Sequence, residues 1–377
     1  MTQDKTPDKI SLKRVIIKGL LLFLLFDLLF APLAPLPTLG QISAYNVIFP
    51  GRMRLPYGEH PDQAYNLSLY NLEAMFASHV LADIKKPLDE YRILIIGDSS
   101  VWGYLLKPEN TLSGYINAAN LKVSDGRLIR AYNLGYPTLS LAKDLLILNY
   151  AIRYQSDLII WLVTLESFPA VKQLDSPIIQ HNPSMMQDLI STYSLDLNLR
   201  DPRFEIPNFW DSTLVGERRA LADILRLQLY GVMWSATGID QYYPESYEPP
   251  QENLAIDESF HGLQPPNLNP ADLSLDVLSA GINMVGNIPI LYVNEPIYIS
   301  HGENSDIRYN FFYPRWVYDQ YRQLFAEICQ TKNWHCLDEW DLVPPDEFTN
   351  SAIHMSPFGT QTLASELEQA ILSLTNP

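Results

Sequence analysis

The sequence has 377 residues, enough for one large domain or two of ordinary size. Its hydrophobic fraction of 47% is that of a globular protein, and its formal net charge is −17, from 26 basic and 43 acidic residues. A surface this acidic repels phosphate backbones, so we do not expect nucleic acid to be a partner.

The N-terminus reverses this charge and then becomes apolar. Five basic residues fall within the first 18 positions, against two acidic ones, and they lead into the apolar stretch of residues 15–37. This stretch is about as long as a helix that crosses a bilayer, near 20 residues. Lys18 can snorkel to the membrane edge, whereas Asp27 in the middle is unfavourable by about 3 kcal/mol. The positive flank predicts a cytoplasmic tail, residues 1–14, and an exported body.

Residues 15–37 fit either an uncleaved signal anchor or a cleaved signal peptide. The apolar core of residues 19–26 is short, and residues 31–34 are loosely similar to a cleavage region. Proline close before a cleavage point is unusual, however, and Pro32 lies there. We therefore favour a transmembrane anchor, which makes the protein a single-pass protein of the cell membrane with its body outside the cytoplasm.

The sequence contains two cysteines, Cys329 and Cys336. Outside the cytoplasm they can form a disulfide between a helix end and the next strand, and two unpaired thiols are the alternative. The seven histidines are scattered, and neither a CxxC pair nor an HExxH motif occurs. We therefore expect no metal site.

After a membrane-proximal segment, residues 38–90, with a helical run near 67–81, apolar runs follow an alternating order. Strands are predicted at residues 92–96, 128–134, 158–165, 288–294 and 335–338. Helices are predicted at residues 141–152, 272–284, 314–329 and 357–374. This alternation predicts an α/β fold in which helices cover both faces of a mainly parallel sheet, giving three layers.

The alternation lapses between residues 167 and 270. This stretch holds two helical patterns, residues 184–194 and 213–233, and an acidic, aromatic, proline-rich loop. We interpret it as an insertion within one domain of residues 91–377. Long insertions at the carboxyl ends of strands commonly shape a binding cleft.

Three segments that carry reactive groups are expected to meet at the carboxyl edge of the sheet. Ser99 follows the first strand directly, where its hydroxyl can act as a nucleophile and its own N–H can face a developing oxyanion. Gly135 follows the second strand, where it allows close backbone approach and can add a backbone N–H. His354 precedes the last helix and can act as a general base. Asp98 and Ser100 are expected to be turn and capping residues.

This pattern resembles the SGNH hydrolase (GDSL esterase/lipase) superfamily over about residues 91–165 and 286–374. The first-block Gly-Asp-Ser of that family matches residues 97–99, Gly97, Asp98 and Ser99. Its second-block glycine matches Gly135, and its C-terminal histidine matches His354. The resemblance is therefore carried by three blocks in the family's order.

The resemblance implies a serine hydrolase that acts on ester bonds. Ser99 would attack the ester carbonyl, and His354 would take the proton and return it. The N–H groups of Ser99 and Gly135 would hold the tetrahedral oxyanion. No metal or organic cofactor is implied.

Two positions depart from the family pattern. The family has an aspartate three residues before the histidine, where this chain has Ser351. Asn350 can accept the Nδ1 proton of His354, but it supplies no negative charge. The family's third block places an asparagine after the third strand, where this chain has Leu165 and Glu166. The predicted site is therefore a Ser–His dyad oriented by Asn350.

Three functions fit these features. The first is an exported, membrane-tethered esterase or deacylase, and the second is an acyltransferase that modifies a cell-surface polysaccharide with the same nucleophile. The third is a non-catalytic scaffold or glycan-binding module, which the two departures favour. The expected partners are an ester-bearing small molecule, lipid or cell-surface glycan, together with the membrane. Glu295, after the fourth strand, is expected either to face the cleft or to cap a loop.

Overall fold

The computed structural model describes residues 11–375 except 41, 43, 50–69, 71, 78, 84 and 238–242. The predicted cytoplasmic tail therefore lies outside the described residues, apart from its last four positions. So does the start of the helical run predicted near 67–81. The rest of that run forms the short helix α4, Leu72–Ala77, and a 3₁₀ turn at Val80–Asp83.

A five-stranded sheet forms the centre of the body, and within the described chain all of its strand pairs are parallel. Its order is β2-β1-β3-β4-β5. The strands are β1 Glu90–Gly97, β2 Leu128–Gly135, β3 Leu158–Val163, β4 Ile290–Asn294 and β5 His335–Asp338. Each overlaps a strand predicted from its apolar run, and the α/β prediction is confirmed.

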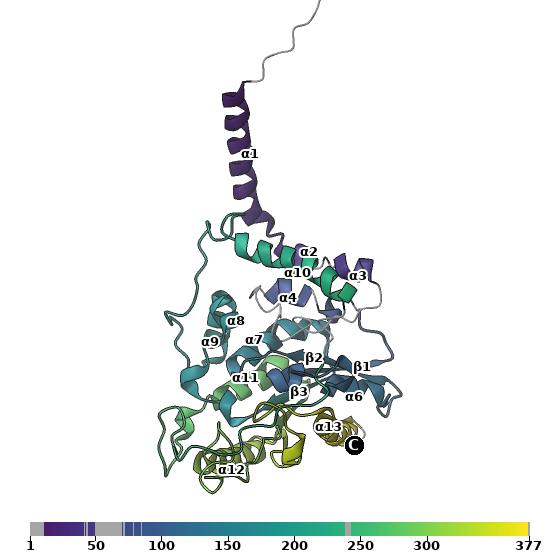
Figure 1. Ribbon diagram of the computed structural model, residues 1–377, viewed down its shortest axis with the longest axis vertical. Helices are drawn as coiled ribbons and strands as arrows, with labels where there is room; N and C mark the ends of the chain where they lie inside the picture. Colours follow the sequence, from purple (N-terminus) through teal and green to yellow (C-terminus); the bar gives the residue numbers. More distant parts are fainter. Residues whose placement is uncertain are drawn as a thin grey trace, which may run out of the picture.

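Helices cover both faces of the sheet, which makes three layers (Figure 1). Alternate residues of β1 point to opposite faces, as the period of a strand requires. Leu94 and Ile96 share a core with helices α7, α11 and α12, whereas Ile93 and Ile95 share one with α6 and α13. These helices are α6 Leu112–Ala118, α7 Leu141–Ala151, α11 Leu275–Val285, α12 Arg315–Lys332 and α13 Pro357–Thr375.

The insertion adds helices α8 Pro177–Gln180, α9 Pro183–Tyr193 and α10 Arg218–Thr237. Helix α10 begins five residues later than its apolar pattern predicts. The N–H groups of Leu214 and Val215 are bound to the carbonyl and the carboxylate of Asp27, at 3.4 and 2.8 Å, instead of to a preceding turn. This tertiary contact displaces the start of the helix.

The N-terminal helix α1, Leu12–Leu33, projects from the body, and α10 lies across its base (Figure 1). Among the described residues, it is the one helix long and apolar enough to cross a membrane, and a signal sequence has the same character. It ends three residues before α2, Leu36–Gly40, which precedes α3, Ala44–Ile48. Asp27 is the only side chain of α1 that is buried.

Two links hold peripheral segments to the sheet. Cys329 and Cys336 form a disulfide, with an S–S distance of 2.12 Å, that joins α12 to β5. Of the two alternatives for the cysteines, the structure contains the bond. In the membrane-proximal segment, Nε2 of His79 donates to the carbonyl of Asn133 at 2.8 Å. His79 therefore has a structural contact with β2.

Candidate active site

A tight turn holds Ser99 at the carboxyl end of β1. The chain leaves the strand at Gly97, whose φ is +156°, and enters the short helix α5, Ser99–Trp102. A Cβ atom at position 97 would lie 2.6 Å from Cγ2 of Val101, so the turn is built around a glycine. The Asp98 carboxylate accepts a hydrogen bond from the N–H of Ser100 at 2.8 Å and caps the helix, as predicted.

The structure brings Ser99, His354 and Asn350 together from two distant parts of the chain. The Ser99 hydroxyl donates to Nε2 of His354 over 2.7 Å. On the other side of the ring, Oδ1 of Asn350 lies 3.2 Å from Nδ1. An amide oxygen only accepts, so this contact places the imidazole proton on Nδ1 and leaves Nε2 to accept from the serine.

Burial keeps the His354 imidazole in the form that a general base requires. Loss of water around the ring lowers the pKa of His354 from 6.5 to about 4. The ring of Tyr104 stacks on it, with 4.7 Å between the ring centroids. At neutral pH the histidine is therefore uncharged and can take the proton of Ser99.

The backbone N–H of Ser99 and that of Gly135 have different surroundings. The N–H of Ser99, at the first position of α5, has no acceptor within the part of the chain that the structure describes. The N–H of Gly135 donates to Oδ1 of Asn133 at 2.9 Å. In this conformation Gly135 therefore does not present the oxyanion donor that the sequence suggested.

Gly135 does allow two backbones to approach closely, the other property expected of it. A Cβ atom at this position would lie 2.3 Å from the backbone nitrogen of Trp102, in α5. Such a distance is far below van der Waals contact, and a backbone atom cannot swing aside as a side chain does. The glycine thus lets the helix that carries Ser99 rest on β2.

A buried lysine lies beneath the turn, and the sequence pattern did not indicate it. Lys143, at the start of α7, has a completely buried side chain whose Nζ donates to the carbonyls of Gly97 and Tyr136, at 2.7 and 3.0 Å. Its charge is balanced by Asp144, 2.5 Å away. Lys143 therefore ties the ends of β1 and β2 together. In the sequence it is a polar residue on a helix, which gives no signal for this role.

Glu295 takes neither of the two positions expected for it. Its side chain is fully buried and accepts a hydrogen bond from the hydroxyl of Ser100, so it lies beneath the turn. Burial, reinforced by the nearby Asp98 carboxylate, raises the pKa of Glu295 well above its ordinary value. Loss of water also raises the pKa of Asp98.

Glu166, which follows β3, contacts two polar side chains of the insertion. Its carboxylate forms an ion pair with Lys172, and both of its oxygens lie 2.9 Å from Nε2 of His261. Burial raises the pKa of Glu166, but the hydrogen bond from His261 and the Lys172 ammonium outweigh it, so the pKa lies below its ordinary value. The Glu166 carboxylate is therefore held by Lys172 and His261. The sequence did not indicate either one.

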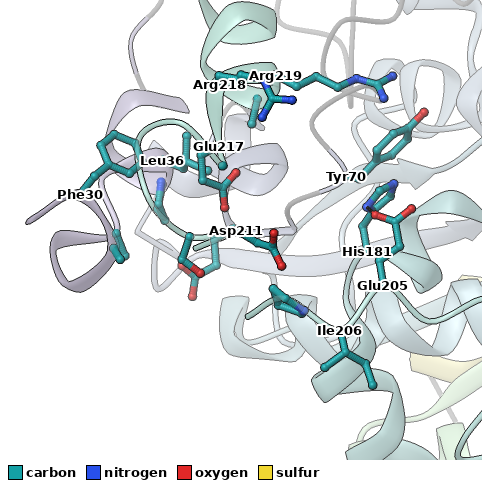
Figure 2. Close-up of a pocket in the computed structure, with 18 residues that line it drawn as sticks. Phe30, Leu36, Tyr70, His181, Glu205, Ile206, Asp211, Glu217, Arg218 and Arg219 are labelled. Carbon is teal, nitrogen blue, oxygen red and sulfur yellow. Dashed lines mark ion pairs between the residues drawn. The ribbon is translucent and has the colours of Figure 1, made fainter. Parts of the chain in front are cut away.

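A cavity of about 640 Å³ lies elsewhere, between the end of α1 and the start of α10 (Figure 2). The figure shows Arg218 and Arg219 on one side, the Tyr70 and His181 rings stacked on another, and Asp211 and Glu217 on a third, toward Leu36. None of the predicted site residues lines this cavity. We therefore assign it no part in the chemistry of Ser99.

Comparisons with known proteins give matches to solved structures. No protein-family model matches the sequence, and no curated protein matches it. A carbohydrate acetylesterase from Sinorhizobium meliloti is 14% identical with a TM-score of 0.35, and an aryl esterase from M. smegmatis is 12% identical with a TM-score of 0.35. Each match covers 75% of this chain and 99% of the other.

A third match is described as a lipolytic protein of the G-D-S-L family from Desulfitobacterium hafniense. It is 12% identical with a TM-score of 0.32, and the match covers 74% of this chain and 98% of the other. Two of these neighbours are described as esterases and the third as a member of the G-D-S-L family, the family that the three sequence blocks resemble. At such identities and TM-scores, activity and substrate rest on the residues of this chain.

Proposed function

We propose that the protein is a serine esterase or deacylase that cleaves ester-linked acyl groups with a Ser99–His354 dyad. One observation carries the proposal: the Ser99 hydroxyl lies 2.7 Å from Nε2 of a histidine whose pKa is lowered by burial, to about 4. A serine held this way is poised to lose its proton as it attacks a carbonyl carbon.

The reaction would proceed through an acyl-enzyme. Oγ of Ser99 forms a bond to the carbonyl carbon while Nε2 of His354 takes the serine proton. The imidazolium then gives that proton to the leaving alkoxide as the ester bond breaks. Water then attacks the acyl carbonyl and loses a proton to Nε2, and the imidazolium returns this proton to Oγ of Ser99 as the acyl bond breaks and the acid is released. Asn350 orients the ring throughout by accepting from Nδ1.

Oxyanion stabilisation would rest first on the N–H of Ser99, at the start of α5. Gly135 could add its N–H only after releasing Oδ1 of Asn133. An oriented but uncharged Asn350 stabilises an imidazolium less than an aspartate does. We therefore expect a slower enzyme than a Ser-His-Asp triad with two oxyanion donors.

We also propose that α1 is an uncleaved anchor and that the body lies outside the cytoplasm. The buried Asp27 carboxylate of α1 accepts a hydrogen bond from Val215 of the insertion. Removal of α1 as a leader would break this contact and leave the N–H of Val215 without its acceptor. The disulfide between Cys329 and Cys336 suits an oxidising compartment. Substrates there include lipid esters and acylated glycans.

Reaction with a fluorophosphonate probe tests the proposed chemistry. The wild-type protein should be labelled and should hydrolyse p-nitrophenyl acetate, whereas Ser99→Ala should lose labelling and reduce kcat/KM by at least about a thousandfold. Ser191→Ala removes an exposed hydroxyl from α9 and serves as the matched control, with unchanged activity. A folded wild-type protein that neither labels nor hydrolyses any ester would favour the non-catalytic module instead.

A further inference from the structure

Exposed apolar side chains gather where α1 meets the body. The turn formed by residues 208–217 carries Phe209, Trp210 and Val215, which are 54%, 66% and 45% exposed. This turn leads directly into α10, which lies across the base of α1 beside α2 and α3 (Figure 1). Large aromatic side chains at such exposure are typical of the boundary between a membrane and water.

The contact of Asp27 sets the depth of this turn along α1. The 22 residues of α1 make a helix about 33 Å long, close to the roughly 30 Å thickness of a hydrocarbon core. Asp27 lies six residues before the end of the helix, or about 9 Å, and binds the N–H of Val215. If α1 spans the bilayer, the turn must therefore reach into its outer boundary.

The exposed face of α10 has the chemistry of a helix that lies on a membrane. Leu225, Leu229 and Met233 are spaced by four residues, so they share one face, and they are 64%, 67% and 57% exposed. The arginines at positions 218, 219 and 226 are exposed as well. The single acidic residue of α10, Asp223, is buried and paired with Arg226. The turn before α10 adds two carboxylates, Asp211 and Glu217, which line the cavity of Figure 2 together with Arg218 and Arg219.

We propose that residues 208–217 and the exposed face of α10 form a membrane-seating surface that inserts into the headgroup region of the bilayer. The apolar side chains would enter the acyl boundary while the arginines bind lipid phosphates. The body would then be held flat against the membrane that α1 crosses. This inference rests on the proposed anchor, and its occupant is the lipid bilayer.

Site-specific fluorescence quenching in nanodiscs tests the surface on the full chain. Because both native cysteines are in a disulfide, an introduced cysteine is the only free thiol that a fluorophore can label. Nanodiscs of phosphatidylcholine and phosphatidylglycerol would carry doxyl-labelled lipid as the quencher. Labels at Leu229→Cys and Trp210→Cys should be quenched at least about twofold, since quenching requires contact with the lipid.

Ile256→Cys provides the matched control. Ile256 is also an exposed apolar residue of the insertion, at 75%, but neighbouring Glu258 accepts from Trp316 of α12, at the end of the body away from α1 (Figure 1). Its label should not be quenched. A label at Leu21→Cys, within α1, reports on the anchor itself.

The outcomes separate the two proposals. Quenching at position 21 but not at 229 or 210 would overturn the membrane-seating surface and leave the anchor standing. Quenching at 229 and 210 without quenching at 21 would support the surface and contradict the anchor. No quenching at any of the three would overturn both. Circular dichroism of each labelled protein confirms that it is folded.

Discussion

At the scale of single residues, the site depends on a histidine that is kept neutral and on an amide that orients it. The presence of Ser99 and His354 at one edge was predictable, because a serine after a strand and a histidine before a helix have recognisable sequence contexts. The environment of His354 was not predictable, because the ring that stacks on it belongs to Tyr104, 250 positions earlier in the sequence. Its lowered pKa determines the pH range of the proposed reaction.

The substitution Asn350→Asp tests this orientation through pH. In the wild type, kcat/KM should stay constant from pH 8 to about 5 and fall as His354 is protonated near its pKa of about 4. A carboxylate 3.2 Å from Nδ1 stabilises the imidazolium, which raises the histidine pKa. The acid limb of the profile should therefore move up by at least about one unit, while the rate at pH 8 is maintained or raised.

Ser351→Asp is the matched control, because it places the carboxylate where the SGNH family carries it. If position 350 contacts Nδ1 as observed, Ser351→Asp should leave the profile closer to that of the wild type. The reverse result, with the limb moved by Ser351→Asp alone, would contradict the contact of Asn350. Both profiles can be measured with the same p-nitrophenyl ester.

At the scale of elements, the alternation of apolar runs predicted the strands and the main helices, because burial on both faces demands near-continuous apolar residues. The start of α10 was not predictable, and neither was the identity of the segment, α5, that approaches β2. They depend on Asp27 and Gly135, each of which meets a partner far away in the sequence. In the sequence, Asp27 is only an acid within an apolar stretch and Gly135 only a glycine after a strand, and neither position indicates its partner.

The close approach at Gly135 predicts that Gly135→Ala lowers the activity of the folded protein as well as its stability. Gly135→Ala forces the backbone of α5 away from β2, which should lower the free energy of unfolding by about 1–3 kcal/mol. Because α5 carries Ser99, the distance to His354 should change as well. We expect kcat/KM of the folded protein to fall by at least about tenfold, measured beside urea unfolding.

Gly114→Ala is suited as a control for this experiment. Its Cβ atom would meet the carbonyl oxygen of Pro108 at 2.3 Å, an equally close backbone contact, but in α6. It should reduce stability to a similar extent and leave kcat/KM of the folded protein within about twofold. Equal activity losses in the two variants would show that the approach at Gly135 has no specific effect on the site.

At the scale of the whole molecule, a projecting apolar helix is joined to an acidic α/β body through the insertion. From the sequence, residues 167–270 were expected to shape a cleft at the sheet edge. In the structure this stretch makes two separate sets of contacts. His261 and Lys172 contact Glu166 at that edge, and the N–H of Val215 binds Asp27 of α1. Neither pairing follows from periodicity. Val215 binds Asp27 through its backbone N–H, which its side chain does not reveal, and Lys172 and His261 belong to no recognisable motif.

The contact between α1 and the insertion makes the membrane proposal testable in cells. An intact α1 that is bound to the body should keep the full-length protein in the membrane fraction after high-salt and alkaline washes, because such washes remove peripheral proteins but not a spanning helix. Protease added to intact cells should degrade the body, since the positive N-terminal flank predicts an exported orientation. Edman sequencing of the recovered protein reports on cleavage. A soluble product whose N-terminus lies beyond Ala31 would contradict the anchor, because Asp27 would then be absent and the N–H of Val215 would have lost its acceptor.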